Sequence, residues 1–263
     1  MKRMQERRRS MKEKMNKIPV FYACDDNFVK YTMVSLQSMM DHASKEAQYE
    51  IHVLHTNISE EMQKKMHAME NANFSVQFDH VTEYLHSIQE KLPLRDYYSK
   101  TTYFRLFIAE MFPEIDKAIY IDSDTVVLGD IAQLYAYDLG DAYVGACREQ
   151  VMIQEEVYGT YVEKVLGVER DNYFNAGMLV INCEQFRKNH VLKQFMELLP
   201  MYNFVVTQDE DYLNLICHNK VCWLPQKWNV EVFGQIPCRE EEICVLHYIC
   251  LLYTSPSPRD PKT

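Results

Sequence analysis

The segment from Lys117 to Asp130, KAIYIDSDTVVLGD, constrains the fold of this chain more than any other. Its apolar start predicts a buried strand, and Asp122 and Asp124 follow directly with Ser123 between them. Open α/β sheets bind ligands at the carboxyl ends of their strands. Two adjacent carboxylates repel one another unless a cation offsets their charge, and a divalent metal with oxygen ligands does this. The pattern therefore indicates either a metal site or a polar turn, in which Asp and Ser are ordinary residues.

Apolar strand patterns alternate with helical patterns along the first half of the chain. The predicted strands are residues 18–24, 49–55, 74–78 and 117–121, and the predicted helices are 33–40, 59–69 (opened by a Ser59 cap), 81–91 and 101–111. This order is typical of an α/β fold with a mostly parallel central sheet and helices on both faces. Asp25 and Asp122 then both lie at carboxyl ends of strands and can face one crevice.

The second half has a less regular pattern. It predicts strands at 142–146, 178–181, 221–224 and 243–246, a helix at 150–167 broken at Gly159, and a helix at 183–199. Asn175 precedes two small residues, which fits either a ligand approaching the backbone or a tight turn. Asp209, Glu210 and Asp211 begin a helix, where acidic residues also occur simply as capping charges. His247 ends the last strand and is either an edge residue or a ligand for a metal such as manganese.

Charge and composition narrow the partners. Residues 1–17 carry eight Lys/Arg and two Glu, so a formal total of −10 leaves −16 on the remainder. Such an acidic body argues against a nucleic-acid partner. The basic arm of residues 1–17 is interpreted either as a solvated terminus or as a contact with an anionic membrane surface. The eight cysteines are scattered without a C-x-x-C pair, and no run of 18 apolar residues occurs, so we expect a cytoplasmic protein with reduced thiols.

Glycine usage restricts how a nucleotide could bind. The chain has seven glycines, and none stands in a G-x-G-x-x-G or G-x-x-x-x-G-K pattern. A diphosphate would therefore lack the usual glycine-rich loop at a helix N-terminus. We expect a metal held by the Asp pair to neutralise most of its charge.

Six motifs in order resemble those of the retaining glycosyltransferases of family 8, which include bacterial lipopolysaccharide galactosyl- and glucosyltransferases and glycogenin. They are ACDDN (23–27), TTYFRL (101–106), YIDSD (120–124), FNAGML (174–179), DEDYLN (209–214) and LPQKWN (224–229). The resemblance covers about residues 18–248. It implies a GT-A type, Rossmann-like nucleotide-diphospho-sugar transferase fold, a UDP-sugar donor, and Mn²⁺ with Mg²⁺ as an alternative.

The resemblance also implies roles for individual residues. Asp25 and Asn27, near Ala23, are similar to the family's uracil and ribose contacts. Arg105 resembles an arginine that reaches the donor sugar or diphosphate, and Asn175 with Ala176 resembles a donor-sugar contact. Asp209 resembles the carboxylate that holds the sugar hydroxyls. The implied metal ligands are Asp122, Asp124 and His247, with Ser123 beside the donor.

The chain departs from the family pattern at two places. Glu210 replaces a glutamine that lies close to the anomeric carbon in the family. A carboxylate there would stabilise an oxocarbenium-like transition state or act as a nucleophile, and the sequence leaves both routes to retention open. After His247, the family's glycine and lysine contacts to the diphosphate are absent. Residues 249–263 resemble translated adapter sequence, the alternative being a flexible Pro/Ser-rich tail, so we expect a domain at 18–248 and a weak grip on the diphosphate.

The resulting functional prediction is a Mn²⁺-dependent hexosyltransferase that moves glucose or galactose from a UDP-sugar to a glycan or lipid-linked saccharide. The catalytic candidates are Asp209 and Glu210. The first alternative is a haloacid dehalogenase-type phosphatase, because the residues from Asp122 to Val126 also fit D-x-D-x-T/V, although that motif normally follows the first core strand. The second is a non-catalytic module that binds sugar nucleotides.

Overall fold

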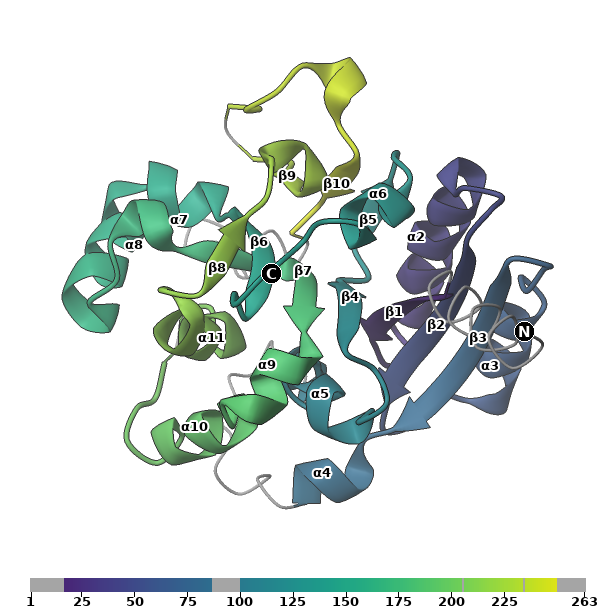
Figure 1. The fold of residues 1–263 in the computed structure, drawn as a ribbon, viewed down its shortest axis with the longest axis horizontal. Helices are drawn as coiled ribbons and strands as arrows, with labels where there is room; N and C mark the ends of the chain where they lie inside the picture. The colour runs from purple at the N-terminus through teal and green to yellow at the C-terminus, as the bar shows by residue number, and fades with distance from the viewer. Residues whose placement is uncertain (1–16, 87–99, 205, 234, 250–263) are drawn as a thin grey trace, which may run out of the picture.

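A seven-stranded sheet in the order β3-β2-β1-β4-β7-β6-β8 forms the centre of the molecule (Figure 1). This computed structural model describes residues 17–86, 100–204, 206–233 and 235–249, so most of the basic arm and of the tail lies outside the described residues. The strands are β1 (Lys17–Ala23), β2 (Gln48–His55), β3 (Phe74–His80), β4 (Lys117–Ile121), β6 (Val144–Arg148), β7 (Phe174–Asn182) and β8 (Val221–Trp223).

The predicted mostly parallel sheet is confirmed. β1 is parallel to β2 and β4, β2 to β3, and β6 to β8. β7 runs antiparallel to both β4 and β6, which the sequence pattern did not indicate. A strand buried on both faces is a continuous apolar run in either direction, so its composition does not reveal its orientation.

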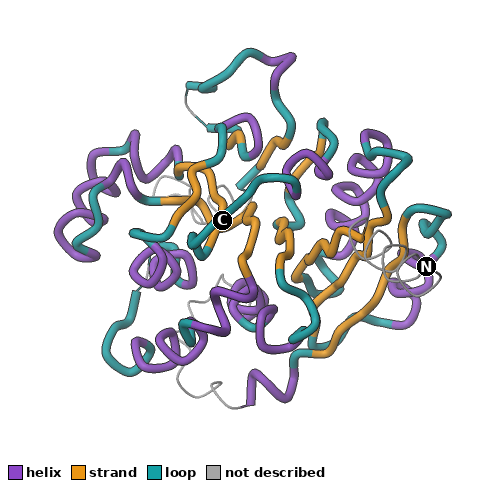
Figure 2. Tube along the Cα trace, in the orientation of Figure 1, coloured by secondary structure: helices purple, strands orange, loops and turns teal. Residues whose placement is uncertain are grey.

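Ten α-helices surround the sheet (Figure 2) in the described part of the chain. They are α2 (Val29–His42), α3 (Glu60–His67), α4 (Thr82–His86), α5 (Ile108–Met111), α6 (Ile131–Tyr135), α7 (Gln150–Gln154), α8 (Glu156–Tyr161), α9 (Cys183–Lys188), α10 (Val191–Leu198) and α11 (Asp209–Cys217). Short 3₁₀ helices occupy Lys100–Leu106, Arg170–Asn172, Gln226–Trp228 and Glu240–Glu242, and a π-helix occupies Val162–Leu166.

Alternate side chains of β4 enter two separate hydrophobic cores, as expected for a strand covered on both faces. Ala118 and Tyr120 pack in the core that includes α5, α9, α10 and α11. Ile119 and Ile121 pack in the core that includes α2, α3 and α6. This double burial holds the end of β4, and with it the Asp pair, in the middle of the sheet.

A second, three-stranded sheet lies beyond the carboxyl end of β4. It consists of β5 (Thr125–Val127), β9 (Val230–Glu231) and β10 (Val245–His247). β10 pairs antiparallel with β5 and parallel with β9, which places His247 opposite Thr125. The sequence pattern predicts the end of β10 but neither β5 nor β9, because strands of two or three residues are too short to show a period of two.

Several predicted helices have different boundaries in the structure. The single helix predicted for 101–111 is a 3₁₀ helix followed by α5, since the β-branched pair Thr101–Thr102 disfavours an α-helical start. The helix predicted for 183–199 is interrupted by His190, whose φ of 53° is left-handed, and continues as α10. Ser59 precedes α3 without a side-chain capping hydrogen bond.

The predicted break at Gly159 is wrong. Gly159 lies inside α8, and the interruption falls at Glu155 between α7 and α8. A Cβ atom at Gly159 would lie 2.6 Å from the Arg170 guanidinium, so the missing side chain serves packing and not chain reversal. The helix predicted for 81–91 is described only as α4, and the remainder lies outside the described residues. In the described part, no helix has the length and apolar character needed to cross a membrane.

Candidate functional site

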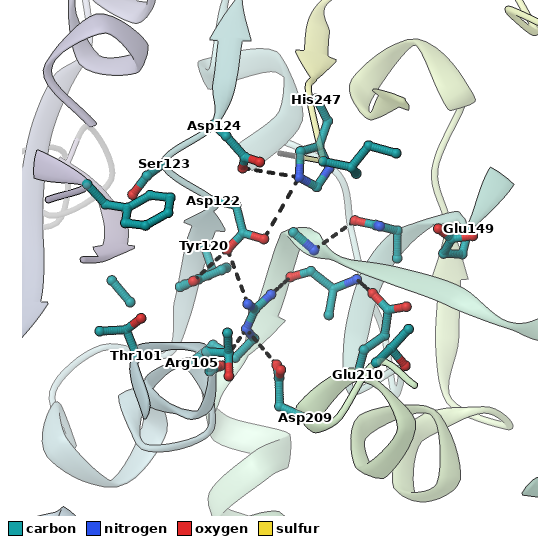
Figure 3. Close-up of a pocket in the computed structure, with 18 residues that line it drawn as sticks. Thr101, Arg105, Tyr120, Asp122, Ser123, Asp124, Glu149, Asp209, Glu210 and His247 are labelled. Carbon is teal, nitrogen blue, oxygen red and sulfur yellow. Dashed lines mark hydrogen bonds and ion pairs between the residues drawn. The ribbon is translucent and has the colours of Figure 1, made fainter. Parts of the chain in front are cut away.

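The two carboxylates after β4 and the imidazole at the end of β10 meet at one point (Figure 3). His247 Nε2 lies 3.4 Å from Asp124 Oδ1 and 3.9 Å from Asp122 Oδ2, and the three ligand atoms lie within 4.8 Å of one another. Two acidic oxygens and one imidazole nitrogen form a donor set that suits Mn²⁺. The residues present therefore fit the metal that the sequence analysis expects.

Backbone pairing explains why these side chains meet. Asp124 O accepts a hydrogen bond from Tyr248 N at 2.9 Å, which continues the pairing of β5 with β10 past His247. Burial lowers the pKa of His247, but Asp124 and Asp122 outweigh this and raise it above its ordinary value. The imidazole is thus held as a partner of the two carboxylates, and a bound cation would replace its Nε2 proton.

β7 is irregular where it passes this cluster. Its register with β6 shifts between Phe174 and Leu179, so the segment Asn175–Ala176–Gly177 does not follow the ladder. Side chains satisfy the freed backbone groups, because Glu210 Oε2 accepts from Ala176 N at 2.7 Å and the Ala176 carbonyl accepts from Arg105. Such bulges often occur beside active sites, where they re-aim side chains.

Gly177 is required by the close approach of the metal-site side chains. A Cβ atom at this position would lie 2.3 Å from His247 Cε1 and 2.7 Å from Asp122 Oδ2. Its carbonyl also accepts from Asp122 N at 2.7 Å. A glycine at position 177 therefore leaves the space that the side chains of His247 and Asp122 occupy.

Arg105 joins the metal cluster to the start of α11. Its guanidinium is buried, donates from Nη2 to Asp122 Oδ1 at 3.1 Å, and lies 3.0 Å through Nε from Asp209 Oδ2. It also stacks over the Tyr120 ring at 4.4 Å, and Tyr120 in turn donates to Asp122 Oδ1 at 2.8 Å. Burial acts to lower the pKa of Arg105, but Asp122 and Asp209 raise it overall, so the arginine stays charged.

Asp209 has a buried oxygen without a hydrogen bond. Arg105 Nε donates its single proton to the Thr102 carbonyl at 2.9 Å. Asp209 Oδ2 therefore lies beside the positive charge of Arg105 but accepts no hydrogen bond. Burial raises the pKa of Asp209 to about 7 against the opposing effect of Arg105. Gln208, just before it, has φ 55° and ψ −107°, a strained conformation of the kind that concentrates at functional sites. Asp209 is thus positioned to accept a hydrogen bond from a ligand hydroxyl.

Glu210 belongs to a group of buried acids that the sequence analysis did not connect. Burial first, and then the charge of Glu149, hold the pKa of Glu210 well above its usual range. Burial and Glu231 likewise raise the pKa of Glu149, and burial raises that of Glu231 to about 8. Glu149 also caps α7 by accepting from Met152 N at 2.6 Å. Burial therefore favours the neutral forms of these acids.

One cavity of about 180 Å³ connects these groups. The predicted site residues that line it are Ala23, Arg105, Asp122, Ser123, Asp124, Asn175, Ala176, Asp209, Glu210 and His247. Asp25 and Asn27 also follow β1 but are not among the lining residues, because Asp25 Oδ1 accepts from Asn27 N and Phe28 N in a tight turn.

Further lining residues were not predicted as site residues. Phe28, Thr101, Thr102, Tyr120, Glu149, Gly177 and Thr207 are among them. Phe28 and Tyr120 follow or precede predicted site residues by one or two positions, so proximity in the sequence was a usable signal. Glu149 lacks such a signal, since only the tertiary fold buries it against α7.

Comparison with known proteins identifies the chain. The model of the family described as "Glycosyl transferase family 8" matches residues 19–251. The chain belongs to this family. A relative from Haemophilus influenzae, named "Putative glycosyltransferase", is 30% identical over 80% of this chain and 62% of its own length. The lipopolysaccharide 1,3-galactosyltransferase of Salmonella typhimurium is 24% identical over 82% of this chain and 64% of its length. The chain thus spans somewhat less than two thirds of these two relatives.

Solved glycosyltransferase structures confirm the GT-A type fold. The galactosyltransferase LgtC in complex with donor and acceptor sugar analogs superposes with a TM-score of 0.73 at 25% identity, covering 88% of this chain and 87% of LgtC. The apo structure of the bifunctional glycosyltransferase WbbM gives a TM-score of 0.76 at 26% identity, covering 89% of this chain and 46% of WbbM. The family match leaves the phosphatase alternative without support.

Proposed function

We propose that this chain transfers a hexose, glucose or galactose, from a UDP-sugar to a glycan or lipopolysaccharide-type acceptor with retention of configuration. The observation that carries the proposal is that Asp122, Asp124 and His247 open onto the same cavity as Asn175 and Asp209. A cation site beside hydrogen-bonding groups for a sugar is what transfer from a nucleotide diphosphate requires. The names of the lipopolysaccharide galactosyl- and glucosyltransferase relatives support this class of substrate.

The cavity offers different chemistry at its different walls. Ala23, Phe28 and Ser123 line a wall where an aromatic ring and small groups can accept a nucleoside. Asp122, Asp124 and His247 would hold Mn²⁺, or Mg²⁺ in its place, which when bound offsets negative charge on the departing UDP. A lipid-linked acceptor would place the reaction at the cytoplasmic face of a membrane.

The wall formed by β7 and α11 would hold the hexose. Asp209 Oδ2 is buried and has no hydrogen-bond donor, so a sugar hydroxyl can supply one. Glu210 lies next to it, and its Oε2 already accepts from Ala176 N. Burial raises the pKa of Glu210 and so favours its neutral form, which is a weak nucleophile. This supports a positioning role for Glu210 over a covalent intermediate.

The decisive experiment measures Mn²⁺-dependent hydrolysis and transfer from UDP-glucose and UDP-galactose by the full chain and by Asp124→Ala. We expect the variant to remain folded and to lose Mn²⁺ binding and turnover together. Undiminished turnover in Asp124→Ala would contradict the site. NMR of the product's anomeric proton tests retention independently.

A non-catalytic sugar-nucleotide binding module is the second candidate. This alternative predicts that the full chain binds Mn²⁺ and a UDP-hexose but shows no hydrolysis or transfer with any glycan in an acceptor panel. Turnover with one acceptor would exclude it.

A further inference from the structure

Asn229 connects the cation cluster to the sugar-facing wall through a single amide group. It follows the 3₁₀ helix Gln226–Trp228 at the start of β9 and has no solvent exposure. Its Nδ2 donates to Asn175 Oδ1 at 2.8 Å, and its Oδ1 lies 3.1 Å from His247 Nδ1. A buried amide with both ends engaged is fixed in orientation.

The hydrogen bonds that link Asn175, Asn229 and His247 all have a defined direction, which is set by one backbone N–H group. Gly177 N lies 2.8 Å from Asn175 Oδ1, and a backbone N–H can only donate, so this atom of Asn175 must be the oxygen. The atom of Asn229 facing it must then be the NH₂ group. The oxygen of Asn229 therefore faces His247 Nδ1, which must carry a proton.

These hydrogen-bond directions determine what the two side chains next to Asn229, His247 and Asn175, can bind. With Nδ1 protonated and bound to Asn229, the neutral His247 ring keeps its lone pair on Nε2, the atom that faces Asp124 and Asp122. At the other end, the Asn175 oxygen accepts from two donors, which leaves its NH₂ group for the cavity that Asn175 lines. The contacts of Asn229 thus favour the His247 tautomer with a free Nε2 and leave the Asn175 NH₂ group facing the cavity.

We propose that Asn229 is a positioning residue that couples cation binding at His247 to donor binding at Asn175. The proposal rests on the proposed function, because the ligand of the Asn175 amide is taken to be a UDP-hexose. Nothing in the sequence indicated this role, since Asn229 was noted only as the last letter of the LPQKWN motif.

Two substitutions separate the two arms of the coupling. Asn229→Asp keeps an oxygen that accepts from His247 Nδ1 but sets a second oxygen against Asn175 Oδ1. Asn229→Ala removes both contacts. Asn182→Ala is the matched control, because Asn182 lies at the other end of β7 and its amide donates to the Gly140 and Ala142 carbonyls. This control loses a helix cap and two amide hydrogen bonds without touching the site.

The measurements are Mn²⁺ affinity by electron paramagnetic resonance, and UDP-glucose and UDP-galactose affinity by calorimetry, on the full chain. We expect Asn229→Ala to weaken Mn²⁺ binding by about 10- to 100-fold, as substitutions behind a ligating histidine do. Asn229→Asp should bind Mn²⁺ at least as tightly as wild type yet lose roughly 10-fold in UDP-hexose affinity, the cost of about one hydrogen bond. Asn182→Ala should lower the melting temperature and leave both affinities unchanged.

The tautomer of His247 provides a readout that is independent of activity. Long-range ¹H–¹⁵N spectra of the metal-free proteins, recorded at a pH above the pKa of His247, should show Nδ1 protonated in wild type and Asn229→Asp, and a mixed population of tautomers in Asn229→Ala. Unchanged Mn²⁺ affinity and tautomer in Asn229→Ala would overturn the proposal, as would an equal loss of Mn²⁺ affinity in Asn182→Ala. If wild type binds Mn²⁺ but neither UDP-hexose, the proposed function fails, while the His247 arm is still decided by metal affinity and tautomer.

Discussion

The side chain of Glu210 accepts a hydrogen bond from the backbone amide of Ala176 at 2.7 Å, inside a wall of the cavity. Burial and the nearby Glu149 raise the pKa of Glu210 well above its usual range, which favours the neutral form of its carboxyl group. A neutral carboxyl has nearly the shape and the acceptor oxygen of an amide. In its neutral form, Glu210 would resemble the glutamine that the family has at this position.

We predict that Glu210→Gln keeps transfer activity within a few-fold of wild type near neutral pH, because it preserves the contact with Ala176 N. Wild type should lose activity at alkaline pH as Glu210 ionises beside Asp209, whereas Glu210→Gln should not. The measurement is kcat/KM against pH for both proteins at saturating Mn²⁺. An identical alkaline decline in the two would show that Glu210 is not the group responsible.

Gly177→Ala should damage the cation site directly. The added methyl would lie 2.3 Å from His247 Cε1 and 2.7 Å from Asp122 Oδ2, and both contacts are with groups that must stay in place to bind a metal. We expect Mn²⁺ affinity to fall at least about 10-fold, in line with other displaced ligands. Gly145→Ala in β6 is the control, because its methyl meets the movable end of Leu139 at 2.9 Å. Equal Mn²⁺ affinity in the two variants would contradict this account.

Arg105→Met should destabilise the fold as well as stop activity. The guanidinium and Asp209 are both about 5% exposed, so removal leaves a buried carboxylate without its counter-charge. Breaking such a pair costs about 3–5 kcal/mol. Asp209 has a pKa of about 7, so at pH 5.5 it is largely protonated and the loss should be smaller than at pH 8. Urea unfolding of both proteins at the two pH values measures this, and a loss independent of pH would indicate that packing alone is responsible.

The sequence was sufficient to predict the parts of the site that follow strands. β4, with its apolar run before Asp122, and β10, ending at His247, were both predicted. The resemblance to family 8 implied Asp122, Asp124 and His247 as metal ligands, and the structure places these three side chains together. Residues whose function depends on tertiary contact were missed. Asn229 contacts Asn175 on β7 and His247 on β10, and Glu149 is buried only by the tertiary fold, so neither residue has a local signature in the sequence.

The sequence pattern also did not predict that β7 runs antiparallel to its neighbours or that its register with β6 shifts. The predicted strand at 178–181 starts instead at Phe174, because the register shift with β6 lets the polar Asn175 and its small neighbours remain inside the sheet. Strand prediction relies on a period of two, and a bulge breaks that period. The same break is what aims Asn175 and Gly177 at the site.

The last prediction concerns Glu231, whose buried carboxyl should make the fold less stable as pH rises. Its pKa is near 4.5 when unfolded and about 8 in the fold, raised by burial first. The folded state therefore binds the proton more tightly, so the stabilisation is complete below about pH 4.5 and is lost as pH rises through about 8. Gln at position 231 cannot ionise, so the free energy of unfolding of Glu231→Gln should fall less between low and high pH than that of wild type. The difference should be about 1.4 kcal/mol for each unit by which the fold raises the pKa of Glu231.

Urea unfolding at pH 5 and pH 8.5 tests this, with Glu241→Gln as the control because Glu241 is about two thirds exposed in the 3₁₀ helix Glu240–Glu242. Wild type and the control should lose stability together between the two pH values, while Glu231→Gln loses less. Glu149 is close enough to take part in the same proton equilibrium, so Glu149→Gln should give a similar, partial flattening. Parallel pH dependence in all four proteins would mean that Glu231 is already ionised in the folded state, with its charge balanced by the Gln150 and Val151 amides.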